Sequence, residues 1–280
     1  MNLNGKTALV LGAVKGIGKA VALDLARAGA AVAIPHYDWP EALPALRHDL
    51  AASGAPHLLV PANLRDTRAA VDLVERVHGH FGALHILINN IERGGWPVVH
   101  GAYTTAQWDL EQETTLRAKQ WVFQAALPRL KAAGEAAVVN ISSIAALVGR
   151  SGPASLLFND GYAAANRAVS LLTETWARLG APQVRVNELM LGLVETRHGP
   201  DTRGWGLLDA AQRQALVDHV LLRRIGTFQD VVEAVRFLLC RAPYMTGSVL
   251  RLDGGYVLGG EAVAPMPQGV EPAADAGSQI

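Results

Sequence analysis

The chain has 280 residues, of which 50% are hydrophobic and 18% are charged, a composition typical of a folded domain with ample material for a core. Its 25 Lys and Arg balance 25 Asp and Glu, so the formal net charge is zero. A chain without net charge has no overall field to hold a polyanion or an acidic lipid surface. Nucleic acid and membrane are therefore not expected as partners.

Cysteine content and the N-terminal residues bear on location. Cys240 is the single cysteine, which excludes a disulfide within the chain and favours a reducing, cytoplasmic location. Lys6, Lys15 and Asp24 interrupt the early apolar residues, and no uncharged apolar stretch reaches the length of a membrane span. Without a linker to divide the chain, we expect one domain over residues 1–260 and a flexible tail over 261–280.

Short apolar runs alternate with amphipathic segments of helical length. The runs cover residues 7–11, 31–34, 57–60, 84–88, 136–141, 183–189 and 248–252. The segments between them that predict helices cover residues 16–28, 41–53, 66–81, 105–133, 161–179 and 229–240. Continuous apolar strands separated by helices indicate a parallel sheet covered on both faces. The fold class expected is a doubly wound α/β sheet of about seven strands, with ligands beyond the carboxyl ends of the strands.

A glycine-rich turn follows the first predicted strand. Gly12, Gly16 and Gly18 surround Lys15 and Ile17 in the spacing Gly-x3-Gly-x-Gly, and a predicted helix starts there. Glycines permit a tight turn and a close approach of the backbone to a pyrophosphate, and a helix N-terminus offers free N–H groups to an anion. The turn is therefore a candidate site for dinucleotide phosphates.

Other segments follow in the order known from the short-chain dehydrogenase/reductase family. Leu11 stands where that family has a Thr before the glycines, and residues 89–92, Asn-Asn-Ile-Glu, resemble its Asn-Asn-Ala-Gly. The remaining matches are Ile141-Ser142-Ser143, Tyr162, Val184-Arg185-Val186-Asn187, Gly192-x-Val194-x-Thr196, Thr246-Gly247 and Asp253-Gly254-Gly255. The chain resembles this family over residues 7–259. The resemblance implies a Rossmann fold, hydride transfer with NADP or NAD, and a homodimer or homotetramer.

The family pairs its catalytic Tyr with a Lys four residues later on the same helix face. In this sequence Tyr162 is followed at that distance by Asn166, which can hydrogen-bond ribose hydroxyls but carries no positive charge. A phenol without a nearby cation has a pKa of about 10 and stays protonated at neutral pH. It can donate a proton to a carbonyl oxygen, and it is a poor base for alcohol oxidation.

Two further polar positions are assigned from the resemblance. Ser143 matches the hydroxyl that polarises the substrate carbonyl, although a strand-end Ser commonly bonds its own backbone instead. Thr115 stands where many members have an Asn that connects a water chain to the Lys. Lys119, one turn later, is a substitute cation or, as we expect more strongly, a solvated helix lysine.

The resemblance also assigns cofactor contacts. Asn90, Gly192, Val194 and Thr196 fall on motifs that line the dinucleotide, and Glu92 replaces the glycine of the Asn-Asn-Ala-Gly motif near the adenine ribose. A side chain and a carboxylate at that place require either an outward bend of the loop or an altered site.

Cofactor choice depends on the end of the second predicted strand. NAD-binding members place an acid there, and this sequence has His36, with Asp38 two residues later. A neutral or positive group with Lys15 suits a 2'-phosphate, so NADP is the preferred cofactor and NAD the alternative through Asp38. Asn63 with Leu64 corresponds to the family's Asp-hydrophobic pair at the adenine.

The substrate region gives the weakest signal. Residues 197–222 predict a lid, and Trp205, Leu207 and Leu208 within it favour a fairly hydrophobic substrate. Arg150, Arg197, His198 and Arg203 are candidates for an anionic group, although surface arginines are common. His78-Gly79-His80 has no third ligand nearby in sequence, so no metal site is expected.

Three functions remain in view. The first is an NAD(P)-dependent reductase of a small carbonyl substrate, with Tyr162 as acid, Ser143 as polarising group and Asn166 as ribose holder. The second is a catalytically silent family member that binds a dinucleotide as a sensor or structural subunit. The third is different chemistry on the same fold, such as dehydration or isomerisation.

Overall fold

Seven parallel strands form the centre of the molecule. The computed structural model describes residues 1–92, 104–195, 208–259 and 263. The sheet has the order β3-β2-β1-β4-β5-β6-β7. The strands are β1 Thr7–Val10, β2 Ala31–His36, β3 His57–Pro61, β4 Ile86–Asn89, β5 Ala136–Ser143, β6 Val184–Leu191 and β7 Val249–Leu252. The predicted doubly wound parallel sheet is confirmed, and every observed strand end lies within two residues of its predicted position.

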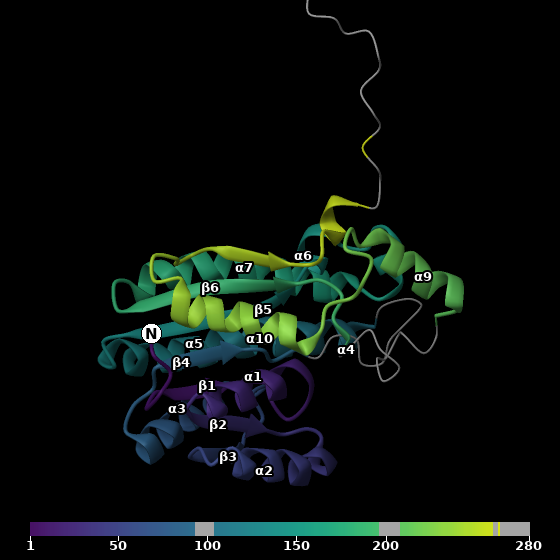
Figure 1. The fold of residues 1–280 in the computed structure, drawn as a ribbon. Coiled ribbons are helices and arrows are strands. Elements are labelled where there is room, and N and C mark those ends of the chain that lie inside the picture. Colours follow the sequence, from purple (N-terminus) through teal and green to yellow (C-terminus); the bar gives the residue numbers. More distant parts are fainter. Residues whose placement is uncertain (93–103, 196–207, 260–262, 264–280) are drawn as a thin grey trace, which may run out of the picture.

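Helices cover both faces of the sheet (Figure 1). One face carries α1 Gly16–Arg27, α2 Leu43–Ala52 and α10 Phe228–Arg236, and the other carries α3 Thr67–Phe81, α5 Ala118–Ala132 and α7 Asp160–Gly180. The predicted helix over 105–133 consists of α4 Thr105–Glu111, a π-helical turn Gln112–Arg117 and α5. Shorter elements are α6 Ala145–Val148, α9 Ala210–His219, a π-helical turn Phe237–Arg241, and 3-10 turns at Pro40–Ala42, Pro153–Leu156 and Tyr256–Leu258.

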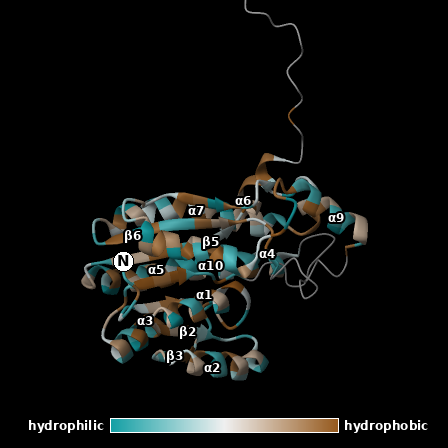
Figure 2. Ribbon diagram, viewed as in Figure 1, coloured by the Kyte–Doolittle hydropathy of each residue, from teal (hydrophilic) through white to brown (hydrophobic). Residues whose placement is uncertain are grey.

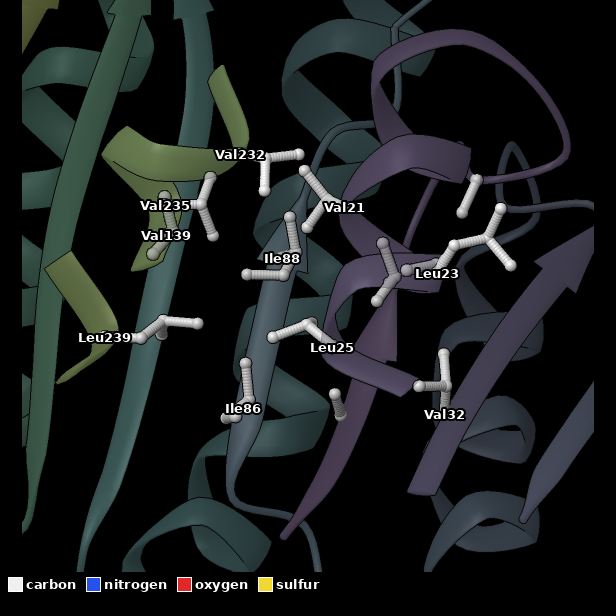
Figure 3. Packing of buried hydrophobic residues seen from close by; sticks show 14 of the residues in the cluster. Val21, Leu23, Leu25, Val32, Ile86, Ile88, Val139, Val232, Val235 and Leu239 are labelled. Atoms are coloured by element: carbon white, nitrogen blue, oxygen red, sulfur yellow. The ribbon is translucent and has the colours of Figure 1, made fainter. Parts of the chain in front are cut away.

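The core lies between the sheet and its helices. Every residue of β1 and β4 is buried, as expected of central strands with helices on both faces. Figure 3 shows side chains of α1 and α10, among them Val21, Leu25 and Val235, facing Ile88 and Val139 of the sheet. Each such side chain contributes about 1.5–3 kcal/mol when fully buried. Hydrophobic and hydrophilic residues are interspersed along the covering helices (Figure 2), as expected of helices with one buried and one exposed face.

The topology defines one edge as the place for a ligand. Strand order reverses next to β1, which pairs with β2 on one side and with β4 on the other. The carboxyl ends of the strands point to the end of the molecule where α4, α6 and α9 lie (Figure 1). Ligands of open α/β sheets bind at such a reversal, beyond the carboxyl ends. No helix of the described residues has both the length and the apolar character needed to cross a membrane.

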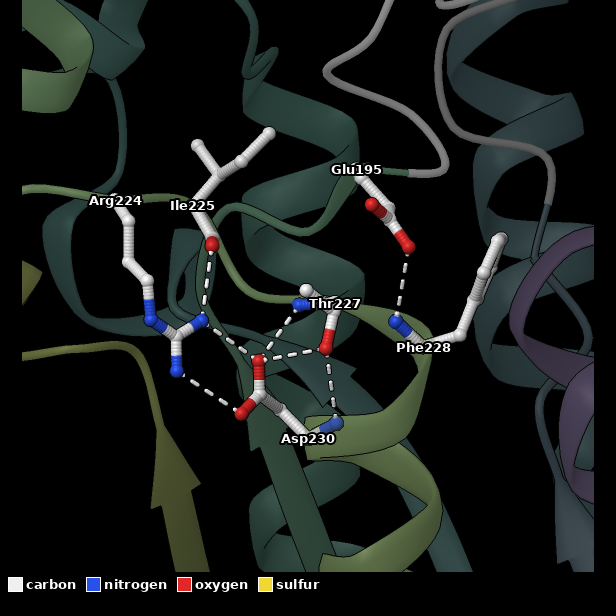
Figure 4. Close-up of polar contacts among 6 residues, drawn as sticks. All are labelled: Glu195, Arg224, Ile225, Thr227, Phe228 and Asp230. Carbon is white, nitrogen blue, oxygen red and sulfur yellow. Dashed lines mark hydrogen bonds and ion pairs between the residues drawn. The ribbon is translucent and has the colours of Figure 1, made fainter.

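A capping box at the start of α10 lies next to the segment that follows β6 at this edge. Thr227 and Asp230 cap α10 reciprocally, and Arg224 forms an ion pair with Asp230 at 2.7 Å (Figure 4). The same turn presents Gly226, whose backbone pairs with Leu193 and Glu195. Hydrogen bonds from Arg224 and from the Thr227 backbone hold the pKa of the Asp230 carboxyl far below its ordinary value.

Replacement of Asp230 by alanine is expected to lower the free energy of unfolding at pH 7 by about 1–2 kcal/mol, since the cap and the ion pair are lost. Because the pKa of Asp230 is depressed in the fold, its contribution is complete above the ordinary carboxyl pKa of about 4 and is lost as the pH falls below it. Urea unfolding of both chains at pH 7 and pH 3 measures this. Asp72→Ala, on the exposed face of α3, is the control, with an expected change within about 0.5 kcal/mol. Equal losses for Asp230→Ala at both pH values would contradict the assignment.

Candidate active site

The glycine turn packs directly against the loop after β4. Gly12 and Gly16 have positive φ angles of 63° and 61°, which only glycine adopts without strain. A Cβ at Gly12 would lie 2.7 Å from the carbonyl oxygen of Asn90, and the Asn90 side chain donates to Gly12 O at 3.0 Å. The sequence predicts a cofactor contact for Asn90. In the structure its side chain joins the glycine turn to the loop after β4.

The N-terminus of α1 fits a phosphate group. Lys15 is the N-cap residue, and its side chain makes no capping hydrogen bond to the first turn of this helix. Its first N–H groups, from Gly16, Ile17 and Gly18 onward, therefore remain available to an anion. The close packing of Gly18 beneath the turn leaves room for a backbone-lined cradle and none for a side chain. These residues fit the pyrophosphate of a dinucleotide.

Substitution of Gly18 by alanine is expected to destabilise the protein by about 1–3 kcal/mol, because a Cβ there would lie 2.2 Å from the backbone oxygen of Gly12 and 2.6 Å from Asn90 Nδ2. Chemical denaturation measures the change, and dinucleotide affinity is expected to fall with it because the cradle must shift. Gly79→Ala in α3 is a matched control. Among the described residues, and apart from its chain neighbours and the backbone of its own helix, no atom lies within 4 Å of a Cβ there, so helix propensity predicts a gain of up to about 1 kcal/mol. An unchanged free energy of unfolding for Gly18→Ala would show that the turn accommodates a Cβ at little cost.

Basic residues gather at the end of β2. The ammonium of Lys15 lies 3.1 Å from the ring centroid of Trp39, a cation–π contact that holds the lysine at this end of the sheet. His36 ends β2, and burial together with the positive charge of Arg47 lowers the pKa of its imidazole. His36 is therefore neutral at pH 7 and can still donate a hydrogen bond. Asp38 lies in the same turn and has contacts of its own.

The remaining predicted cofactor residues lie along the same edge. Asn63 follows β3, and its side chain accepts from Arg65 N at 3.2 Å, while Leu64 is buried. Gly192 follows β6, where a Cβ would lie 2.6 Å from Asp253 Cα. Val194 forms a parallel bridge with Gly226. Thr196 lies outside the described residues.

The two serines at the end of β5 have different partners. Ser143 Oγ accepts from Ala145 N at 3.1 Å, the local contact that competes with a catalytic role, and its own hydrogen can still be donated. Ser142 points to the other face of the strand and bonds the carboxylate of Glu188, which also accepts from Ser170 at 3.1 Å. Ser142 therefore supports Glu188 within the core.

Tyr162 lies in the first turn of α7, after the N-cap Asn159, whose side chain accepts from Tyr162 N at 2.7 Å. Its ring is half-buried and packs near Phe158 with ring centroids 6.0 Å apart. The phenol donates to Glu92 Oε2 at 3.0 Å. Sequence reasoning expected Glu92 near the adenine ribose, and the structure brings its carboxylate to the phenol.

Asn166 and Thr115 are both fully buried. Asn166 Nδ2 donates to Tyr162 O at 3.0 Å, one helical turn earlier. Asn166 Oδ1 and Thr115 Oγ1 are buried without a hydrogen-bond partner among the described residues. Thr115 lies in the π-helical turn between α4 and α5, a distortion frequent at functional sites. Each orphaned oxygen remains an acceptor, which is compatible with a ribose hydroxyl at Asn166.

Lys119 corrects an expectation, because it is not a solvated lysine. Its side chain has no exposed surface, and Nζ donates to Ile141 O in β5 at 2.6 Å. Its positive charge also acts on Glu188, whose carboxyl pKa is raised by burial and lowered in part by Ser142, Ser170 and Lys119. Sequence reasoning missed Glu188, although a glutamate inside an apolar strand run was a usable signal.

An apolar cluster of buried residues packs against Tyr162. It contains Phe158, Leu208, Leu216 and Tyr256. Tyr256 is fully buried and its hydroxyl accepts from Ala154 N at 2.8 Å. Arg150 forms a long ion pair with Asp160, 3.8 Å apart on the surface. The other predicted substrate residues, Arg197, His198, Arg203, Trp205 and Leu207, lie outside the described residues.

Comparison with known proteins relates this chain to a family. Residues 12–257 match the family model described as enoyl-(acyl carrier protein) reductase. A probable short-chain type dehydrogenase/reductase of Bradyrhizobium diazoefficiens is 34% identical, with 97% of each chain covered. The 3-oxoacyl-(acyl-carrier-protein) reductase FabG of Thermotoga maritima is 31% identical over 92% of this chain and 100% of its own length. A crystal structure of a putative short-chain alcohol dehydrogenase from Sinorhizobium meliloti aligns with a TM-score of 0.81 and 28% identity, covering 92% of this chain and 98% of the other.

The chain therefore belongs to the short-chain dehydrogenase/reductase family, and the relatives above are named as dehydrogenases or reductases. Members of this family generally bind NAD(P), and the phosphate turn described above fits such a cofactor.

Proposed function

We propose that the protein reduces a small, fairly hydrophobic carbonyl compound with a reduced nicotinamide cofactor. The observation that carries the proposal is the position of Tyr162, with a donatable phenol proton, at the same sheet edge as Ser143 and the phosphate turn. The apolar cluster beside Tyr162 suits an apolar substrate. When bound, the cofactor supplies the hydride.

The residues of the chain then divide the work. Ser143 donates its hydroxyl hydrogen to the carbonyl oxygen and orients it toward Tyr162. Tyr162 donates the phenol proton to the same oxygen as negative charge develops there. Asn166 holds a ribose hydroxyl through Oδ1, which requires a shift of the side chains that now bury it. Thr115, buried in the same region, is proposed to continue the polar path behind Asn166.

For the cofactor we propose NADP in preference to NAD. Lys15, fixed on Trp39, and Arg47, whose charge reaches His36, favour a 2'-phosphate at the end of β2. Gly12, Gly16, Ile17 and Gly18 would receive the pyrophosphate through their backbone. The adenine would lie near Asn63 and Leu64, and Asn90, Gly192, Val194 and Thr196 would line the remaining length.

The domain bounds, the cellular location and the oligomeric state are also proposals. Residues 1–260 are proposed to act as one catalytic domain with a flexible tail over 261–280, in the cytoplasm. Exposed apolar side chains on α5 and α7, namely Trp121, Leu171 and Leu179, favour a homodimer or homotetramer.

The experiment is a titration of NADPH and NADH into the purified protein, followed by nicotinamide absorbance with a carbonyl panel that includes a 3-oxoacyl thioester. We expect tighter binding of NADPH and consumption of it with at least one carbonyl. Asn166→Lys is run in parallel as the variant that supplies the family's cation. Failure of both dinucleotides to bind would refute the proposal.

A silent dinucleotide-binding member is the second candidate function. The observation that favours it is the phenol proton of Tyr162, which is held by a carboxylate, next to an asparagine that brings no cation. This function predicts binding without turnover in the natural chain, with activity only in Asn166→Lys.

A further inference from the structure

The contact between Tyr162 and Glu92 joins two distant parts of the chain. Glu92 comes three residues after the end of β4, and Tyr162 lies in the first turn of α7, 70 residues later. The phenol oxygen and Glu92 Oε2 are 3.0 Å apart, the distance of a normal hydrogen bond. The carboxylate accepts because it has no hydrogen of its own when ionised.

This contact changes what the phenol can do. An isolated phenol is a poor base for an alcohol, because it must first lose its own proton. A carboxylate in hydrogen-bond contact can receive that proton while the phenol oxygen takes another. Asn166, at the position where a cation would stabilise a phenolate, carries no charge.

The charged groups on the neighbouring elements have other contacts. Asp160 of α7 pairs with Arg150, Glu111 of α4 accepts from Asn159 Nδ2 at 3.3 Å, and Lys119 of α5 donates to Ile141 O. Glu92 is the charged group to which the phenol hydrogen is directed.

We propose that Glu92 accepts the proton of the Tyr162 phenol and, as a positioning residue that acts through Tyr162, enables alcohol oxidation near neutral pH. The inference rests on the proposed function and adds a proton-accepting residue to the same site. In oxidation the alcohol proton passes to Tyr162 Oη, the phenol proton passes to Glu92 Oε2, and the alcohol carbon gives its hydride to the oxidised nicotinamide dinucleotide. The carboxylic acid then returns its proton to water. In reduction every proton moves in the opposite sense.

The kinetic test compares pH profiles of alcohol oxidation for the natural chain, Glu92→Gln and Glu92→Asp. Glu92→Gln keeps an acceptor of similar shape and removes the base. We expect its rate at pH 7 to fall at least about tenfold and to recover as the pH approaches the phenol's own pKa of about 10. Glu92→Asp retains a carboxylate and is expected to keep a neutral-pH rate between the two. Glu174 is an exposed glutamate on α7, the helix that carries Tyr162. Glu174→Gln is therefore the matched control, and its pH profile should equal that of the natural chain.

A second measurement does not need turnover. Tyrosinate absorbance is titrated for the natural chain and for Glu92→Gln, and each curve is corrected with its Tyr162→Phe counterpart to isolate Tyr162. Removal of the adjacent negative charge is expected to lower the phenol pKa. If the natural chain binds a dinucleotide without turnover, the proposed reductase function fails, and the titration alone decides whether Glu92 acts on the phenol. An unchanged phenol pKa, or a pH profile of Glu92→Gln that matches the natural chain, would overturn the inference.

Discussion

Replacement of Lys119 by methionine is expected to lower the free energy of unfolding at pH 7 by about 3–5 kcal/mol, the cost typical of removing one partner from a buried charged cluster. Methionine has nearly the length of the lysine stem, so packing is largely kept. The variant leaves Ile141 O without its donor and Glu188 without the nearby positive charge. Glu188 is fully buried and Ile141 is 5% exposed, so solvent replaces little of what is lost. Equilibrium unfolding in urea measures the effect.

The pH dependence of this loss tests its electrostatic origin. Burial raises the pKa of Glu188, so the fold holds this proton to higher pH than the unfolded chain, and its protonation stabilises the fold most at low pH. Without Lys119 the carboxyl pKa rises further. The loss in Lys119→Met is therefore expected to be smallest below about pH 4, where Glu188 is protonated in both states, and to grow as the pH rises. The double variant Lys119→Met with Glu188→Gln is expected to lose less than the sum of the single variants. Additive losses, or a loss independent of pH, would contradict the coupling of the two charges.

Replacement of Tyr162 by phenylalanine is expected to lower kcat for carbonyl reduction by about a hundredfold to ten-thousandfold, the range typical of losing a general acid. The ring and its packing near Phe158 stay, and only the proton donor and the hydrogen bond to Glu92 are lost. The affinity for NADPH, measured by titration, should change little because the phosphate turn is untouched. Steady-state kinetics with the best substrate of the carbonyl panel measures the effect.

Tyr244→Phe serves as the control, because the side chain of Tyr244 is fully exposed and its hydroxyl should not influence turnover. Retention of activity by Tyr162→Phe would show that Tyr162 is not the general acid and that a different group donates the proton. Loss of dinucleotide binding together with turnover would instead assign Tyr162 to cofactor placement.

Several features could be read from the sequence because they depend on local pattern. Apolar runs of strand length separated by amphipathic segments fix the alternation of strands and helices, and a sheet covered on both faces leaves few alternative folds. The phosphate turn could also be predicted from local chemistry, because a turn with positive φ angles before a helix needs glycine, as at Gly12 and Gly16. Such signals act over a few residues and do not need knowledge of distant contacts.

Tertiary structure decided the environment of each charged group. Lys119 looks like any helix lysine in the sequence, because only the packing of α5 against β5 determines that its ammonium is buried on Ile141 O. The resemblance placed Glu92 near the adenine ribose and left open an outward bend or an altered site, and only the fold shows that its carboxylate accepts from Tyr162. The sequence by itself determined the strands, the helices and the phosphate turn. The distances among Glu92, Tyr162, Asn166 and Lys119 were decided by the fold, because hydrogen bonds and charge interactions depend on separations of a few ångströms between segments far apart in the chain.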